Sequence, residues 1–225
     1  ELAGGYQGSK PVAGPPRWQF TENDGLTAAL PPSDAGKKTL PPLRPLGQVA
    51  GNYIVAEGPD GIYIIDQHAA HERLMYEKIK KQWAKRQVET QGLLTPVTLE
   101  VTPQQAAVLQ SDLAQFTAFG FELEPFGTRT YLVRQVPATL TGADWLGAIR
   151  EILDAPAAGD EKIEAMMKSL ACHSVVRAGQ RLTDDEIRSL IREMEQAEQP
   201  FTCPHGRPTL ISLSTGQLAK EFGRS

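Results

Sequence analysis

From about residue 46 onward, apolar residues recur at strand or helix spacing, and this pattern predicts a mixed α+β chain. An almost wholly apolar run at 62–66 follows a Gly- and Pro-containing turn at 58–61 and predicts a buried strand. Residues 48–57 predict the strand that pairs with it as a hairpin. A helix is expected to follow, from residue 69 or 70 to residue 85. Further strands are expected at 97–101, 121–126, 130–136 and 209–213, and further helices at 103–119, 144–154, 160–178, 184–196 and 216–222.

Residues 1–43 show no steady hydrophobic period and are rich in proline. Proline fixes the backbone and lacks an N–H donor, so such a stretch disfavours helices and sheets. We interpret residues 1–43 as a flexible linker. Because the chain starts with Glu1 and not with Met, we expect it to be a piece of a longer protein.

The 225 residues include 23 Lys and Arg against 27 Asp and Glu, which gives a formal net charge of -4. A free-standing nucleic-acid binder is usually basic, so contact with DNA is expected only through a local patch, a metal site or a partner. The presence of only two cysteines excludes a disulfide framework and favours a reducing, cytoplasmic setting. No apolar run approaches the ~18 residues of a transmembrane helix, so no membrane partner is expected.

Asp66, His68 and Glu72 lie where the predicted buried strand passes into a helix. His68 and Glu72 are four residues apart, so they share one helix face about one turn apart. Two ligands at this spacing can converge on one metal ion, and Asp66 lies beside them at the strand end. The simpler alternative is that carboxylates at this position cap the helix or complement its dipole.

Both cysteines lie in short segments that also contain histidine. Cys172 precedes His173, and Cys203 lies two residues before His205 in a proline-rich segment. Thiolate, imidazole and carboxylate donors suit zinc and admit other transition ions. Taken alone, Cys172 is interpreted more simply as a small buried apolar residue, and the basic run at 78–86 as a solvated helix face.

Four motifs, in the same order, resemble those of MutL-type DNA mismatch-repair proteins. Residues 66–77 read D-Q-H-A, two residues, E, four residues, E, which is the spacing of that family's endonuclease motif. Residues 171–173 resemble its A-C-basic segment, and residues 203–208 match its C-P-H-G-R-P segment. Residues 222–224 resemble its terminal F-x-R. The motifs place about residues 46–225 in this family.

The resemblance implies the α+β fold of the MutL C-terminal domain, which has two subdomains. A dimerisation and endonuclease subdomain would consist of residues 44–90 and 166–225. A smaller regulatory subdomain, residues 91–165, would be inserted between these parts. The linker at 1–43 would come from an N-terminal ATPase, so this fragment is not expected to bind ATP.

The resemblance also implies a two-metal site that nicks DNA. The catalytic residues would be Asp66 and Glu72. The metal ligands would be His68, Glu72, Cys172, Cys203 and His205. Zn²⁺ would occupy the two sites, and Mn²⁺ would serve as the activating ion. Two alternatives stay open: a non-catalytic dimerisation module with structural zinc, and a zinc hydrolase that acts on a small molecule.

DNA phosphates would be held by His173, Arg207 and Arg224. His173 stands where the family usually has Arg or Lys. Because an imidazole is cationic only part of the time near neutral pH, His173 is a weaker phosphate contact than either of them.

Residues 91–96 resemble the Q-x-L-[LI]-x-P segment with which family members bind the replicative sliding clamp, with Gln91, Leu93, Leu94 and Pro96 as the contacts. The implied partners are therefore DNA, a second copy of the chain, the sliding clamp and, through the full-length protein, the mismatch-recognition protein MutS. The implied location is the bacterial cytoplasm, at the nucleoid.

Overall fold

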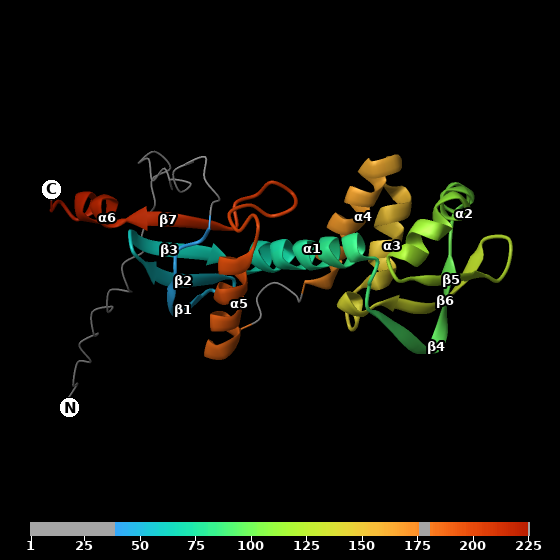
Figure 1. Cartoon of the computed structure of the whole chain (residues 1–225), viewed down its shortest axis with the longest axis horizontal. Coiled ribbons are helices and arrows are strands. Elements are labelled where there is room, and N and C mark those ends of the chain that lie inside the picture. The colour runs from blue at the N-terminus through green and yellow to red at the C-terminus, as the bar shows by residue number, and fades with distance from the viewer. Residues whose placement is uncertain (1–38, 176–180, 225) are drawn as a thin grey trace, which may run out of the picture.

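The computed structural model describes residues 39–175 and 181–224. These residues form an elongated molecule with one β-sheet towards each end and the long helix α1 (Gln67–Lys85) between them (Figure 1). The predicted α+β class is confirmed.

Four antiparallel strands of the described residues form the first sheet, in the order β1 (Arg44–Val49), β2 (Tyr53–Gly58), β3 (Gly61–Asp66) and β7 (Leu210–Ser214). The expectation of a single strand over 48–57 is wrong, because a turn divides it between β1 and β2. Ala50 and Gly51 in this turn have φ angles of 52° and 68°. Two successive residues with positive φ suit a tight hairpin turn, although alanine is not a residue that signals one.

Helix α1 begins at Gln67, two or three residues before its predicted start at 69 or 70, because Asp66 caps it. The Oδ1 atom of Asp66 accepts hydrogen bonds from the backbone N–H groups of His68 and Ala69 at 2.9 and 3.0 Å. These bonds satisfy donors that the first helical turn leaves free. The helix then spans two cores, with Ala70 in the first and Tyr76 and Ile79 in the second.

Helix α5 (Asp184–Gln196) covers one face of the first sheet. The core between them includes Ile54, Ile65, Ile187, Leu190, Ile191 and Met194. Leu40 and Leu43 belong to the same core and are 5% and 9% exposed. The packed chain therefore starts before residue 44, where the predicted linker ends, because two leucines of that linker are buried. Residues 1–38 of the predicted linker lie outside the described residues.

The second sheet has the antiparallel order β4 (Thr90–Glu100), β6 (Thr130–Pro137) and β5 (Glu122–Pro125). The helices around its core are α2 (Pro103–Ala118), the short 3₁₀ helix η1 (Ala138–Leu140), α3 (Trp145–Asp154) and α4 (Gly159–Ser174). This core contains large, fully buried side chains such as Phe116, Leu99 and Met166. Helix α4 also packs on α1, so the second core is continuous with the central helix.

The bounds of α4 and α6 can be compared with the helices expected at 160–178 and 216–222. Helix α4 ends at Ser174, before the predicted end at residue 178, and residues 176–180 lie outside the described part of the chain. Helix α6 (Thr215–Glu221) follows β7 at the end of the molecule (Figure 1).

The division into subdomains at residues 91 and 165 stays a prediction. Within the described ranges, no helix combines the length and apolar character needed to cross a membrane.

Candidate metal centre

Glu72 lies at the centre of a group of polar side chains, and its own side chain is 1% exposed. Its Oε1 atom is 3.3 Å from Nε2 of His68, one turn earlier on α1. Its Oε2 atom is 3.6 Å from Nδ1 of His205 and 3.2 Å from Nη2 of Arg207. A buried carboxylate is costly unless such partners compensate its charge. These contacts therefore tie α1 to the distant loop at 203–208.

The 203–208 loop is closed by its own backbone between α5 and β7. The N–H of Cys203 donates to the carbonyl of Arg207 at 2.8 Å, and the N–H of Gly206 donates to the carbonyl of Cys203 at 3.0 Å. Gly206 has a φ of 83°, a conformation that glycine adopts without steric cost. The loop buries Cys203 and brings ligand atoms of Glu72, Cys203 and His205 within 4.8 Å of one another.

Cys172, near the end of α4, is linked to the same carboxylate. Burial raises the pKa of Cys172 to about 11, and the charge and hydrogen bond of Glu72 act in the same direction. A hydrogen bond to Cys203, followed by the charge of Glu72, raises the pKa of Arg207. A metal ion bound here would have to displace the proton of Cys172, because a thiol binds metals as the thiolate.

The donor types fit a zinc ion. Glu72, Cys203 and His205 offer oxygen, sulfur and nitrogen, and a soft sulfur ligand favours zinc over magnesium. Nδ1 of His68 is buried without a hydrogen-bond partner among the described residues. Buried polar atoms normally have a partner, so an orphaned ring nitrogen favours a ligand role for His68. The nitrogen that faces Glu72 is, however, Nε2, and His68 is not among the described residues whose ligand atoms converge within 4.8 Å.

Not every predicted site residue joins this cluster. Asp66 lies six residues before Glu72, about 9 Å along the helix axis, and its carboxylate caps α1. Nε2 of His173 is 2.8 Å from Oε2 of Glu151, so a carboxylate already holds the ring that was expected to contact phosphate. Arg224 follows α6, which lies at the end of β7 remote from α1 (Figure 1).

Comparison with known proteins identifies the family. A model of the MutL C terminal dimerisation domain matches residues 46–182, more than half of the chain. The chain belongs to this family. The resemblance to MutL-type proteins that the motifs indicated is thereby confirmed.

Individual MutL proteins are similar over most of the chain. The DNA mismatch repair protein MutL of Koribacter versatilis is 39% identical over 209 residues, which are 90% of this chain and 32% of that protein. MutL of Symbiobacterium thermophilum is 38% identical over 88% of the chain and 34% of its own length. MutL of Rhizorhabdus wittichii is 42% identical over 79% of the chain and 31% of its own length. The chain spans about a third of the length of the curated relatives that it matches.

In this MutL domain, two residues of α1 bind the backbone of the segment that leads into the 203–208 loop. The sequence predicted neither contact. The side chain of Arg73 donates to the carbonyl of Thr202, and Glu77 accepts backbone hydrogen bonds from Glu198 and Gln199. The motif spacing singled out Glu77 without indicating a partner. No sequence signal singled out Arg73, because its partner is a backbone carbonyl 129 residues away.

The predicted clamp-binding segment of the MutL domain lies on β4, an edge strand of the second sheet. Its pairing with β6 shifts register between Gly92 and Val97. Leu94 is fully exposed within this stretch, and a leucine in this state is available to a partner. Gln91, Leu94 and Pro96 are thus exposed on an irregular edge, whereas Leu93 is half-buried and packs against the second core.

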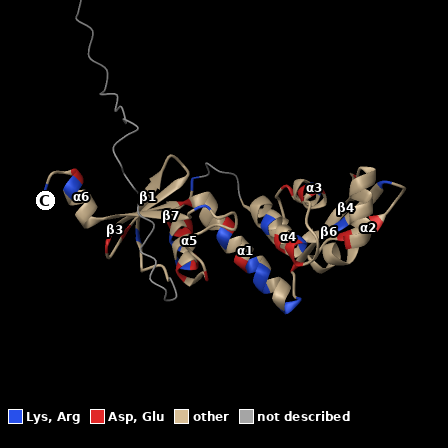
Figure 2. Ribbon diagram, turned by 90° about the horizontal axis from the view of Figure 1, so that it is seen from above, with Lys and Arg blue, Asp and Glu red and all other residues tan. Residues whose placement is uncertain are grey.

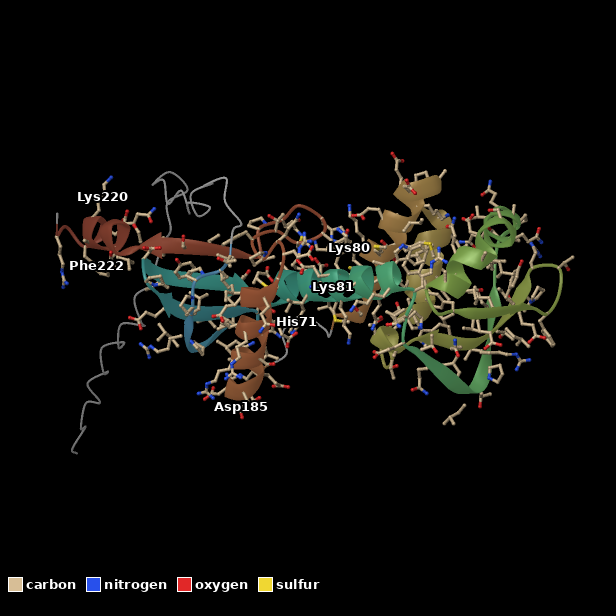
Figure 3. The ribbon with its side chains drawn as sticks, in the orientation of Figure 1. His71, Lys80, Lys81, Asp185, Lys220 and Phe222 are labelled. Atoms are coloured by element: carbon tan, nitrogen blue, oxygen red, sulfur yellow. The ribbon has the colours of Figure 1, made fainter. Side chains whose placement is uncertain are left out.

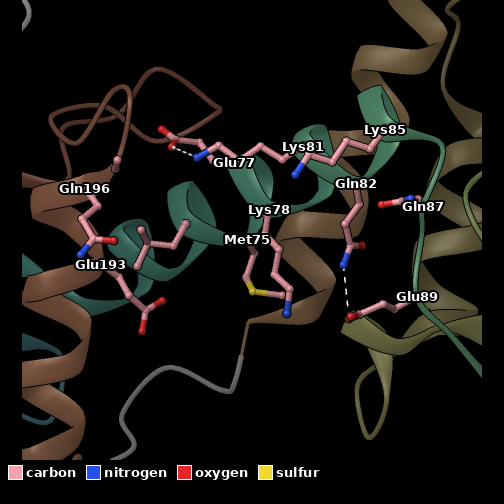
Figure 4. A pocket seen from close by; sticks show the side chains of 12 residues that line it. Met75, Glu77, Lys78, Lys81, Gln82, Lys85, Gln87, Glu89, Glu193 and Gln196 are labelled. Atoms are coloured by element: carbon pink, nitrogen blue, oxygen red, sulfur yellow. Dashed lines mark hydrogen bonds and ion pairs between the residues drawn. The ribbon is translucent and has the colours of Figure 1, made fainter.

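Lys and Arg residues recur along α1 of the MutL domain (Figure 2). Some of them line a groove of about 420 Å³ between α1 and the end of α5 (Figure 4). The charged residues of this groove are Lys78, Lys81, Lys85, Glu77, Glu89 and Glu193. At 100° per residue, the lysines lie roughly 180–240° around the helix from Glu72. The groove is electrically balanced and faces away from the cluster, which favours the interpretation as a solvated face.

His71 also lies away from the cluster. It is on the side of α1 that faces α5, whereas Lys80 lies towards the loop that follows α5 (Figure 3). Burial lowers the pKa of His71, which favours a neutral ring near neutral pH. His71 is therefore packed between helices and is not part of the donor set.

Proposed function

We propose that this MutL domain is a metal-dependent endonuclease that nicks DNA during mismatch repair. The single observation that supports this function best is the convergence of Glu72, Cys203 and His205, three donor types on two distant segments. A purely apolar core has no need of such a set, in which Glu72 and Cys203 are buried and His205 is exposed. The acidic composition is compatible with DNA binding, because bound cations draw phosphate locally.

The ions would be held by His68, Glu72, Cys172, Cys203 and His205, with Glu72 and Cys203 shared between two positions. Bound ions of this kind supply an activated water and stabilise charge on the leaving oxygen. Zinc suits the sulfur ligands, and manganese is proposed as the activating ion.

The side chains of the domain would orient the phosphodiester and move protons. Both capping bonds of Asp66 are made to Oδ1, so we assign to Oδ2 the role of accepting a proton or orienting water. Arg207 is 60% exposed and lies 3.2 Å from Glu72, so a permanent cation lies beside the cluster within reach of solvent. Arg207 would hold phosphate, whereas His173 is engaged with Glu151.

Replacing Asp66 with asparagine tests the catalytic role separately from the capping role. Asparagine caps helices about as well as aspartate, so we expect little change in the free energy of unfolding. Loss of the acid-base group should lower the rate of plasmid nicking in manganese roughly 100-fold. Nicking of closed-circular plasmid and thermal unfolding are measured on the same samples.

Asp66→Ala serves as the control for the cap, because it should destabilise the fold by about 1 kcal/mol as well as remove the carboxylate. If Asp66→Asn nicks at the parental rate, Asp66 is only a helix cap and the catalytic assignment is wrong.

The second candidate function is a non-catalytic dimerisation module with structural zinc. The observation that favours it is the use of Asp66 as the cap of α1, which explains an acidic residue at this position without chemistry. Bound zinc with no nicking by the parent domain would support this alternative.

We also propose a homodimer formed through the outer face of the first sheet. Helix α5 covers the opposite face, on which Ile54 and Ile65 are buried. The outer face carries cross-strand rows of apolar residues, including Val55 beside Ile64 and Ile62 beside Leu213. At one end of this face, Val49 and Tyr53 pair directly and are 56% and 44% exposed. An apolar sheet face of this kind is suited to a second copy.

The sliding clamp is the proposed partner of residues 91–96. Replacing Leu94 with alanine should weaken clamp binding about ten-fold, which corresponds to the burial of part of one leucine side chain. Because Leu94 is fully exposed, the unfolding temperature of the domain should not change. Binding is measured by surface plasmon resonance. Phe126→Ala removes an exposed aromatic directly after β5 and is the control that should bind normally. Equal loss in both variants would contradict a specific Leu94 contact.

MutS would act with this domain through the full-length protein, in the bacterial cytoplasm where the DNA lies. The proposal rests on the names of the relatives, which are DNA mismatch repair proteins.

A further inference from the structure

The carboxylate of Glu77 is a buried anchor for the chain between α5 and the 203–208 loop. The residue is 6% exposed, five residues past Glu72 on α1. Its Oε2 atom accepts the N–H of Glu198 at 2.9 Å, and its Oε1 atom accepts the N–H of Gln199 at 3.0 Å. Both oxygens are therefore occupied by successive backbone donors, which fixes the position of this segment relative to α1.

Arg73 holds the same segment three residues later. Its Nε atom donates to the carbonyl of Thr202 at 2.5 Å, directly before Cys203. The guanidinium group lies 5.3 Å from the ring centroid of Tyr76, and Arg73 is only 6% exposed. A packed arginine of this kind has few alternative conformations, so its hydrogen bond fixes the distance between α1 and Thr202.

One helix thus carries both the buried carboxylate of the cluster and the anchors of the opposing loop. Beyond Thr202, backbone hydrogen bonds close the loop on itself between Cys203 and Arg207. The position of the 198–202 segment therefore determines how far the donor atoms of Cys203 and His205 lie from Glu72. A displacement of about 1 Å is large for a metal site, whose ligand distances vary by only about 0.2 Å.

We propose that Glu77 and Arg73 are positioning residues that set the metal affinity of the cluster by fixing the 198–202 segment on α1. The inference rests on the metal site of the proposed function, but not on the nicking reaction. Residues that orient ligands from outside a metal site typically change affinity about 10–100-fold when they are replaced. We expect an effect of this size from Glu77→Ala, and a similar direction from Arg73→Ala.

The test is metal binding by the complete 225-residue chain. Zinc affinity is measured by competition with a chromophoric chelator, and cobalt binding is followed through its thiolate charge-transfer absorption. Lys81→Gln is the matched control, because Lys81 lies 3.9 Å from Glu77 on the exposed side of the helix. Circular dichroism of the metal-free proteins shows whether each variant is folded.

The expected result is a folded Glu77→Ala protein with zinc affinity lowered about 10–100-fold and a weakened cobalt-thiolate band, beside parental values for Lys81→Gln. Parental zinc affinity in folded Glu77→Ala would overturn the inference, as would a parent chain that binds no zinc. If Glu77→Ala does not fold, Glu77→Gln decides, because its amide keeps one acceptor oxygen. Reduced affinity in that variant supports the anchor, and unchanged affinity overturns it.

The two proposals fail separately. If the parent binds zinc and the anchor variants lose it, the positioning role stands even when the parent does not nick DNA. If the parent nicks DNA and the folded anchor variants bind zinc normally, the endonuclease proposal stands and the positioning role is wrong.

Discussion

Replacing Glu72 with alanine is expected to abolish metal binding at the cluster and to reduce DNA nicking to background. Glu72 is the residue on which His68, His205, Arg207 and the thiol of Cys172 converge. Four-ligand zinc sites bind with about 10–16 kcal/mol, or roughly 3 kcal/mol for each ligand, so loss of one ligand costs about 100-fold in affinity. Loss of a ligand that is shared by two ions should lower the metal affinity further.

Metal content after dialysis and nicking in manganese measure this effect. The control is Glu124→Ala on the second sheet, where an exposed ion pair with Arg134 should contribute at most ~1 kcal/mol. Normal zinc content in folded Glu72→Ala would exclude this cluster as the metal centre. Arg207 and His205 are 60% and 40% exposed, so water can solvate them in the variant and the fold should survive.

Replacing Ile64 with aspartate is expected to convert the dimer into monomers. Ile64 lies on the outer face of β3, between Val55 and Ile211 in the cross-strand row. Enclosing an unpaired carboxylate in an apolar interface costs several kcal/mol, which corresponds to at least about 1000-fold in the dissociation constant. The side chain is only half-buried in one chain, so the monomer should stay folded.

Sedimentation velocity over a range of concentrations measures the change. Leu94→Asp makes the same chemical change at a fully exposed leucine of the second sheet, and it should leave the dimer intact. A dimer of parental stability with Ile64→Asp would show that the outer face of the first sheet is not the interface.

The local structure of this chain was predictable where the pattern is short-range. The apolar run at 62–66 became β3, and the His68–Glu72 spacing became a contact of 3.3 Å on one helix face. The helix expected at 184–196 is α5, and a capping box at Thr183 begins it. The hairpin between β1 and β2 was missed because Ala50 takes a positive φ that alanine rarely adopts.

The long-range half of the site was not predictable from periodicity. Cys203 lies 131 residues after Glu72, and no spacing rule brings the 203–208 loop to α1 over this separation. Only the family resemblance predicted that the loop and α1 share a site. The contact of His173 with Glu151 joins α4 to α3 and depends on how these helices pack. The role of Glu77 was equally hidden, because its partners are backbone N–H groups, which every sequence position except proline offers.

The most direct test is a metal titration in which occupancy and nicking are followed on the same sample. Manganese and zinc are added to metal-free domain with closed-circular plasmid and the sliding clamp present. We predict that open-circular product appears in proportion to occupancy of the Glu72–Cys203–His205 cluster and stops when a chelator removes the ions. Full occupancy without any nicking would contradict an endonuclease and leave a dimerisation module with structural zinc.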